Sequence, residues 1–331
     1  MPGTQARFIA GFLFIPRFIA GFLFLLLLSG CAALAPQSGA LNAHRPADLP
    51  VRAELHDVPY FPQDEYHCGP ASLAMALNAS GVKVSSTALV DQVYLPGRKG
   101  SLQVEMLAAA RRNGRVAYLI EPELTAVLRE VAAGTPVIVL ENFGAPFLPV
   151  WHYSVVIGYD LERGEIIRHS GKHERAAGPI SIFEYFWRNE RWAMVAAGPD
   201  HVPATATEPR YGEAVVALER AGQLRGARSA YEAMLKRWPG SIVALMGAGN
   251  TAYVLGDLAA AEARFREAAA AHPKSVPALN NLAQTLLDRG KLDEARATAE
   301  RAVALGGPLR ASASATLDQI NKRRQSATLP R

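Results

Sequence analysis

The chain has 331 residues, which is enough for two domains, and half of them are hydrophobic while a fifth are charged, as expected for packed globular cores. The formal net charge is +5, and setting aside Arg7 and Arg17 of the apolar N-terminal segment leaves 33 Lys and Arg against 30 Asp and Glu. So mild a balance, with no basic run that contains interleaved aromatic residues, argues against a nucleic-acid partner. An enzyme or a protein-binding module is favoured.

Residues 1–30 are predicted to be a lipoprotein signal peptide. The eleven residues from Phe18 to Leu28 form an apolar core that suits a signal peptide and is too short to span a bilayer. The core ends in Leu28-Ser29-Gly30-Cys31, which resembles the bacterial lipobox, and this resemblance implies a diacylglycerol on the Cys31 sulfur. Ala32, in place of Asp, then implies sorting to the outer membrane, so we expect a lipid-anchored protein of the cell envelope that faces the periplasm. The alternative is a simple membrane anchor in which Cys31 has no role.

Residues 31–50 are rich in Ala, Pro, Ser and Asn and show no periodicity, so we expect a flexible lipidated tether there. The chain has only one other cysteine, Cys68. If Cys31 carries lipid, Cys68 is an unpaired thiol in an oxidising compartment, which indicates that the thiol has a use.

Cys68 is predicted to lie at the N-terminus of a helix. Pro70 fits the first turn, and Leu73 and Leu77 continue with helical spacing. The free amides and the dipole at a helix start lower the pKa of a thiol, and thiolate is the form that attacks a carbonyl. Gln63 lies five residues earlier, where its side-chain amide could join the Cys68 backbone N–H in an oxyanion hole.

A candidate base follows on a later strand. A helix that ends near Gly134 precedes a short buried strand over 135–140, and the next predicted strand opens at His152 and runs to Asp160. An imidazole at the start of an edge strand can face a cleft and take the proton of Cys68. The remaining histidines show no metal-ligand spacing, so neither a metal nor a cofactor is expected.

Together these motifs resemble the bacteriocin-processing, double-glycine type of papain-like cysteine peptidase. The resemblance covers about residues 51–198 and rests on Gln63, Cys68-Gly-Pro-Ala-Ser, Gly100-Ser-Leu, Gly134-Thr-Pro-Val-Ile and His152-Tyr-Ser-Val-Val-Ile-Gly-Tyr. It implies an α+β fold with Cys68 as nucleophile, His152 as base and Gln63 in the oxyanion hole. It also implies cleavage after small residues.

One feature of that family is missing. The family carries an Asp-Pro on the strand after the histidine strand, where the carboxylate orients the imidazole, whereas this chain reads Arg168-His169-Ser170-Gly171. His169, Ser170 or a backbone carbonyl are the three candidates for the orienting group.

The C-terminal third is predicted to be all-α. After a linker over 199–209, glycines 222, 256 and 290 recur every 34 residues, and alanines 227, 261 and 295 keep the same step. This period is typical of the tetratricopeptide repeat, with glycine in the turn and alanine where two helices touch. We expect about three repeats over 210–307, with a concave face for a protein partner, and a polar tail over 308–331 that frays.

The sequence therefore favours a membrane-anchored cysteine peptidase that acts on a peptide or protein, with repeats that recruit the substrate or a partner. Two alternatives stay open: a peptidase-fold lipoprotein that is inert and binds peptides as a scaffold, and an amidase or acyltransferase that uses the same dyad.

Overall fold

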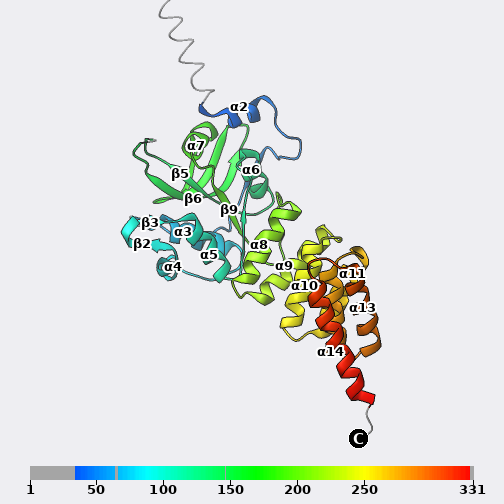
Figure 1. Cartoon of the computed structure of the whole chain (residues 1–331). Helices are drawn as coiled ribbons and strands as arrows, with labels where there is room; N and C mark the ends of the chain where they lie inside the picture. The colour runs from blue at the N-terminus through cyan, green and yellow to red at the C-terminus, as the bar shows by residue number, and fades with distance from the viewer. Residues whose placement is uncertain (1–33, 64–65, 146, 329–331) are drawn as a thin grey trace, which may run out of the picture.

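The structure is a computed structural model that describes residues 34–63, 66–145 and 147–328 (Figure 1). The predicted signal peptide and Cys31 lie outside the described residues. None of the helices within the described part of the chain is both long enough and apolar enough to cross a bilayer.

The first domain is built on an antiparallel sheet, which has seven strands within the described residues, in the order β4-β9-β5-β6-β7-β8 with β1 beside β6. The strands are β1 (Arg52–Glu54), β4 (Val116–Leu119), β5 (Val137–Asn142), β6 (Trp151–Asp160), β7 (Glu165–Ser170), β8 (His173–Pro179) and β9 (Ala193–Ala197). A small hairpin of β2 (Tyr94–Leu95) and β3 (Gly100–Ser101), joined by the 3-10 turn η1 (Pro96–Arg98), lies apart from the sheet. The helices are α2 (Pro36–Ala43), α3 (Cys68–Ala79), α4 (Ser86–Val93), α5 (Gln103–Arg112), α6 (Leu124–Ala132) and α7 (Ile180–Trp187).

The sheet is buried on both faces because its central strands are apolar on both sides. Along β5, Val137 and Val139 pack in the cluster that contains α6 and α7, whereas Ile138 and Leu140 pack in the cluster that contains α3. This alternation follows from the period of two along a strand. The predicted α+β layering of this domain is confirmed, and in Figure 1 the two helix layers lie on opposite sides of the sheet.

The prediction of a flexible tether is wrong for the described residues 34–50. Part of this segment forms α2, which lies against α6 and α7 with Leu41 and Leu49 in the core. The buried carboxylate of Glu184 accepts hydrogen bonds from the amides of Gln37 (2.8 Å) and Ser38 (2.6 Å) at the start of this helix. A carboxylate from a distant element thus caps a short helix that local sequence would not stabilise.

The second domain is a stack of paired helices. These are α8 (Glu208–Arg220), α9 (Leu224–Arg237), α10 (Ile242–Val254), α11 (Leu258–Ala271), α12 (Val276–Asp288), α13 (Leu292–Leu305) and α14 (Arg310–Thr328). The three glycines that recur in the sequence sit between the helices of each pair with φ of +80°, +81° and +74°, a left-handed conformation that glycine adopts without strain. The matching alanines 227, 261 and 295 are fully buried, which confirms the predicted packing of each pair.

The prediction of a frayed polar tail is also wrong, because α14 closes the end of the stack. Ala313 and Ile320 on this helix are fully buried against the preceding pair. A repeat array exposes the apolar face of its last pair unless a capping element covers it. The apolar stripe of α14 is narrow within a polar sequence, and this made the helix look like a tail.

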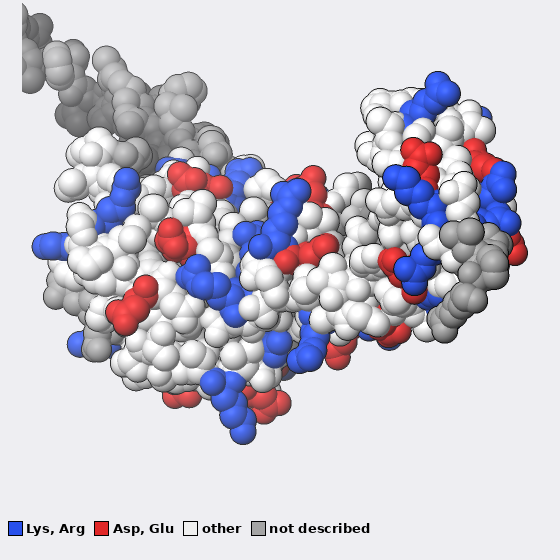
Figure 2. Space-filling model, turned by 60° about the horizontal axis from the view of Figure 1, so that its bottom comes forward, with Lys and Arg blue, Asp and Glu red and all other residues white. Residues whose placement is uncertain are grey.

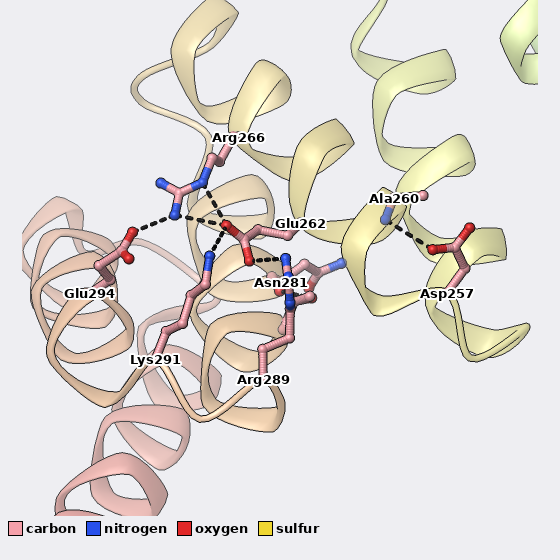
Figure 3. Close-up of polar contacts among 9 residues, drawn as sticks. Asp257, Ala260, Glu262, Arg266, Asn281, Arg289, Lys291 and Glu294 are labelled. Atoms are coloured by element: carbon pink, nitrogen blue, oxygen red, sulfur yellow. Dashed lines mark hydrogen bonds and ion pairs between the residues drawn. The ribbon is translucent and has the colours of Figure 1, made fainter.

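Ion pairs also connect the adjacent helix pairs α10–α11 and α12–α13. The carboxylate of Glu262 on α11 is almost fully buried and pairs with Arg266 on its own helix, and with Arg289 and Lys291 in the turn between α12 and α13 (Figure 3). Arg266 reaches on to Glu294 on α13. The network fixes the spacing of these two pairs, because a buried carboxylate is stable only with its partners in place.

The two domains pack directly on each other. One hydrophobic cluster runs from the sheet through Tyr118 and Tyr211 into α8, α9 and α10. The predicted linker is held on the first domain, where the buried carboxylate of Glu130 accepts hydrogen bonds from the amides of Ala204 and Thr205. Basic and acidic side chains are interspersed on the face shown in Figure 2, so that face presents no broad surface of one sign.

Candidate functional site

Cys68 is the first residue of α3, as predicted, and it lies against the β2–β3 hairpin. Its neighbour Gly69 has no room for a side chain, because a Cβ there would lie 2.2 Å from the Ser101 Oγ. The glycine thus allows the start of α3 to approach the hairpin closely. Helix residues 69–77 are all buried, so the position of the thiol is set by the core beneath it.

The expectation of a lowered thiol pKa is wrong for this structure. Burial raises the pKa of Cys68, although the backbone N–H groups of Tyr153, Gly69 and Cys68 itself act in the opposite direction. The desolvation of a thiolate at this depth outweighs the favourable amides at the helix start.

His152 lies near the start of β6 and lines the same cleft as Cys68. Its ring stacks on Phe143 with 5.2 Å between centroids, and its Nε2 lies 3.1 Å from the Ser170 Oγ. Burial lowers the pKa of His152 to about 4, and the positive charge of Arg168 adds to this effect. The imidazole is therefore neutral at any ordinary pH, which is the state a general base requires.

The structure distinguishes the three candidates for the orienting group. Ser170 contacts Nε2 of His152, whereas the ring nitrogens of His169 lie against the backbone carbonyl oxygens of Val58 (3.1 Å) and Glu174 on the other side of β7. His169 is 4% exposed and ties β7 to the segment that leads to Cys68. Of the two candidate side chains, Ser170 is thus the one that contacts the His152 imidazole.

Gln63 is brought to the cleft beside Cys68 and is 5% exposed. Its Oε1 accepts a hydrogen bond from the Gly171 amide at 3.0 Å, which fixes the side chain against the β7–β8 turn. Its Nε2 lies 3.3 Å from Ser72 Oγ and 3.4 Å from the Tyr153 carbonyl. Both Nε2 contacts are long, so they compete weakly with a stronger acceptor such as an oxyanion.

The cleft has a volume of about 680 Å³. It is lined by Gln63, Tyr66, Cys68, residues 98–102, residues 149–153, Gly171 and Lys172. Among these described lining residues, Arg98, Lys99 and Lys172 are basic and none is acidic. The cleft is thus bounded by the β2–β3 hairpin, the loop before β6 and the β7–β8 turn.

Sequence reasoning missed a buried charge pair behind the histidine. Glu141 lies directly opposite His152 in the β5–β6 ladder, is fully buried, and pairs with Arg168 and the hydroxyl of Ser154. A glutamate that directly follows the apolar run 137–140 of a buried strand is the signal that could have indicated it, because a charge in that position needs a partner.

Comparison with known families agrees with this architecture. Residues 55–191 match the Peptidase_C39 like family, and residues 213–275 and 246–309 match tetratricopeptide repeat models. The chain thus contains a Peptidase_C39-like domain of mixed helices and strands, followed by an all-helical tetratricopeptide region, which confirms the predicted fold class.

Solved structures with partial similarity include the first tetratricopeptide domain of Spaghetti bound to an HSP90 peptide, at 20% identity and a TM-score of 0.34 over 36% of this chain and 93% of that chain. The Yersinia enterocolitica type III secretion translocator chaperone SycD is similar at 20% identity and a TM-score of 0.34, over 36% of this chain and 94% of that chain. No curated protein matches the chain.

Proposed function

We propose that this protein is a lipid-anchored cysteine peptidase of the cell envelope that cleaves a peptide or protein substrate. The observation that carries the proposal is the convergence of Cys68, His152 and Gln63 on one cleft, with the Nε2 of His152 on Ser170. Two segments far apart in sequence meet here: residues 63–68 supply the nucleophile and an amide donor, and His152 supplies the base, as peptide-bond hydrolysis requires.

In the proposed reaction, the Cys68 sulfur attacks the scissile carbonyl while His152 takes the thiol proton. Since burial favours both the neutral thiol and the neutral imidazole, proton transfer accompanies the attack rather than preceding it. The Nε2 of His152 is engaged by Ser170, so Nδ1 is the nitrogen that takes the proton. The Gln63 amide and the Cys68 N–H stabilise the oxyanion. His152 then protonates the leaving amine, and water hydrolyses the thioester.

The resemblance to double-glycine peptidases favours a small residue before the scissile bond. Tetratricopeptide arrays commonly bind protein segments on their concave face, so the repeats of this chain would hold the substrate or a partner complex near the cleft. The direct packing of α8 on the first domain would keep these two sites at a fixed separation.

The cleavage test uses a mixed peptide library and mass spectrometry. We expect the mature protein to cut a subset of peptides, and we expect Cys68→Ala and His152→Ala to abolish cutting. The substitution His173→Ala, at an exposed histidine on β8, is the matched control and should leave cutting intact. Cleavage that survives Cys68→Ala would refute the proposed nucleophile.

The anchor is tested separately in cells. Metabolic labelling with an alkyne fatty acid should mark the wild-type chain and leave Cys31→Ser unmarked, and only the wild-type chain should float with outer-membrane vesicles. Equal labelling of both chains would refute acylation at Cys31.

A second candidate is a peptide-binding scaffold with a weak or inert site. It is favoured by the raised pKa of Cys68 and by a neutral serine in the place of the family's carboxylate. In that case the library peptides would bind without being cut, and Cys68→Ala would leave binding unchanged.

A further inference from the structure

A group of exposed apolar side chains lies near the first described residues of the chain. We call this group the apolar rim, and it consists of Phe143, Phe147, Leu148 and Val150 between β5 and β6, Trp151 at the start of β6, and Ile182 and Tyr185 of α7. Its large side chains are well exposed, at 90% for Phe147, 69% for Leu148, 56% for Val150 and 52% for Ile182. The loop sequence from Phe143 to Trp151 contains no charged residue. An exposed cluster of this size normally marks an interaction surface.

Ring contacts hold the two parts of the apolar rim together. The ring of Phe143 packs on Phe186 of α7 at 5.0 Å, and Phe186 packs on Tyr185 at 5.4 Å. Ile182 lies three residues before Tyr185 and so shares its face of the helix. The other face of Phe143 stacks on His152, so the apolar rim reaches the cleft.

The start of the chain is fixed next to this surface. Glu184, directly before Tyr185, holds the amides of Gln37 and Ser38, and Ala35 is 6% exposed. Only three residue steps separate Leu34 from Cys31, and even fully extended they span roughly 10–11 Å. One headgroup layer is about 5–8 Å deep, so this reach exceeds it by only a few ångströms. A lipid on Cys31 would therefore hold α7 against the bilayer surface.

The orientation of the rest of the molecule is consistent with such an arrangement. In Figure 1, α2 and α7 lie at one end and α14 at the other, so a bilayer at the first end would leave the repeats free. The cation of Arg188 stacks on the ring of Tyr185 at 4.0 Å, which puts a positive charge beside the exposed aromatic surface. Aromatic residues with adjacent cations favour the headgroup region of anionic membranes.

We propose that the apolar rim inserts into the interface of the phospholipid bilayer that carries the lipid of Cys31. This inference rests on the proposed lipid anchor. Because Pro149, Val150 and Trp151 of the same loop line the cleft, the cleft then opens at the membrane surface. The substrate class that this favours is a polypeptide segment lying at or emerging from the bilayer, rather than a freely diffusing protein.

The test uses Trp151, which is 42% exposed, as an internal probe. The mature chain carrying Cys68→Ser has Cys31 as its sole cysteine. Cys31 is coupled to a maleimide lipid in vesicles of phosphatidylethanolamine and phosphatidylglycerol, whose acyl chains carry bromine atoms. Of the other three tryptophans, Trp187 is fully buried, while Trp192 and Trp238 are half-buried against Tyr153 and Tyr211 outside the apolar rim, so the bromines should quench Trp151 most strongly. We expect the fraction of fluorescence that is quenched to fall at least twofold in Trp151→Phe, and also in the double variant Phe147→Asp, Leu148→Asp.

Chemical coupling separates this inference from the proposed function, because it holds residue 31 at the membrane whether or not cells acylate it, and Cys68 is not needed. Equal quenching with and without Trp151 would overturn the inference and leave the anchor and the peptidase untouched. If the unanchored Cys31→Ser chain sediments as a dimer and Phe147→Asp makes it monomeric, the apolar rim is a self-association surface and the proposal is wrong.

Discussion

Replacing Ser170 by Asp tests the resting protonation state of the Cys68–His152 pair. The structure favours a neutral pair, because burial acts on both groups and the oxygen beside Nε2 of His152 belongs to an uncharged hydroxyl. An aspartate at this position would place a negative charge next to the imidazole, on the side away from the proton that Cys68 gives up. The variant should therefore shift the pair towards thiolate and imidazolium.

The free energy of proton transfer from Cys68 to His152 in the wild-type site follows from the two pKa values. That of His152 is about 4, and that of Cys68 is raised above its ordinary 9.0, so transferring the proton from thiol to imidazole is opposed by a gap of at least about five. At 1.36 kcal/mol per pKa unit the gap corresponds to roughly 7 kcal/mol. Attraction between unit charges about 4 Å apart returns about 4 kcal/mol at an effective dielectric constant of 20. The remaining ~3 kcal/mol leaves the ion pair below about 1% of the resting protein.

The assay is the rate at which iodoacetamide alkylates Cys68 between pH 5 and 9, in a Cys31→Ser background. In the wild-type site, we expect the rate to rise with pH throughout, because the thiolate fraction does. A nearby carboxylate raises an imidazole pKa by about 1–3. Ser170→Asp should thus react at least tenfold faster at pH 6, while the uncharged analogue Ser170→Asn should not. A wild-type rate that is constant from pH 5 to 8 would show a preformed ion pair and refute the reasoning.

Three further predictions concern the scaffold. Hydrogen exchange of the full chain should show that Glu262→Gln destabilises α11–α14 by about 1.5–3 kcal/mol, because Arg266, Arg289 and Lys291 lose a charged partner. The loss is limited to this range because these three side chains are partly solvated, and the exposed control Glu267→Gln should change stability little. Burial raises the pKa of Glu262, but hydrogen bonds from Lys291 and Arg266 lower it overall, so the stabilisation that Glu262 provides is present above the ordinary glutamate pKa and should be lost as pH falls through the lowered value. A stability difference between wild type and Glu262→Gln that does not shrink as the pH falls below the ordinary glutamate pKa would contradict this. Glu184→Gln should speed amide hydrogen exchange in α2 at least tenfold and leave exchange in α3 unchanged, because the amides of Gln37 and Ser38 lose a charged acceptor. Unaltered exchange in α2 would show that packing alone holds this helix. Gly249→Ala should lower the melting temperature of the chain by several degrees, because the new Cβ would lie 2.5 Å from the Phe265 ring, whereas Gly240→Ala has open space and should be neutral; equal melting temperatures would refute the clash.

The elements that carry Cys68 and His152 show how much of the structure local sequence signals predict. The sequence by itself indicated the start of α3 at Cys68 and the strand that carries His152, because each depends on local signals such as a Pro in the first helical turn or an apolar run of strand length. The 34-residue period was equally local, since glycine and alanine recur where every helix pair needs them.

Packing between distant segments decided the rest. No local signal shows that Glu184 caps α2, that the stripe of Ala313 and Ile320 closes the repeat stack, or that Ser170 rather than His169 meets His152. The register of β7 against β6 sets this last choice, because neighbouring residues on a strand face opposite sides of the sheet.

Electrostatics at the site were likewise a tertiary property. The sequence determined that a cysteine stands at a helix start, where the free amides favour a thiolate. Only the structure showed how much protein covers that cysteine, and at this depth desolvation outweighs the amides, so the thiol and the imidazole are both neutral at rest.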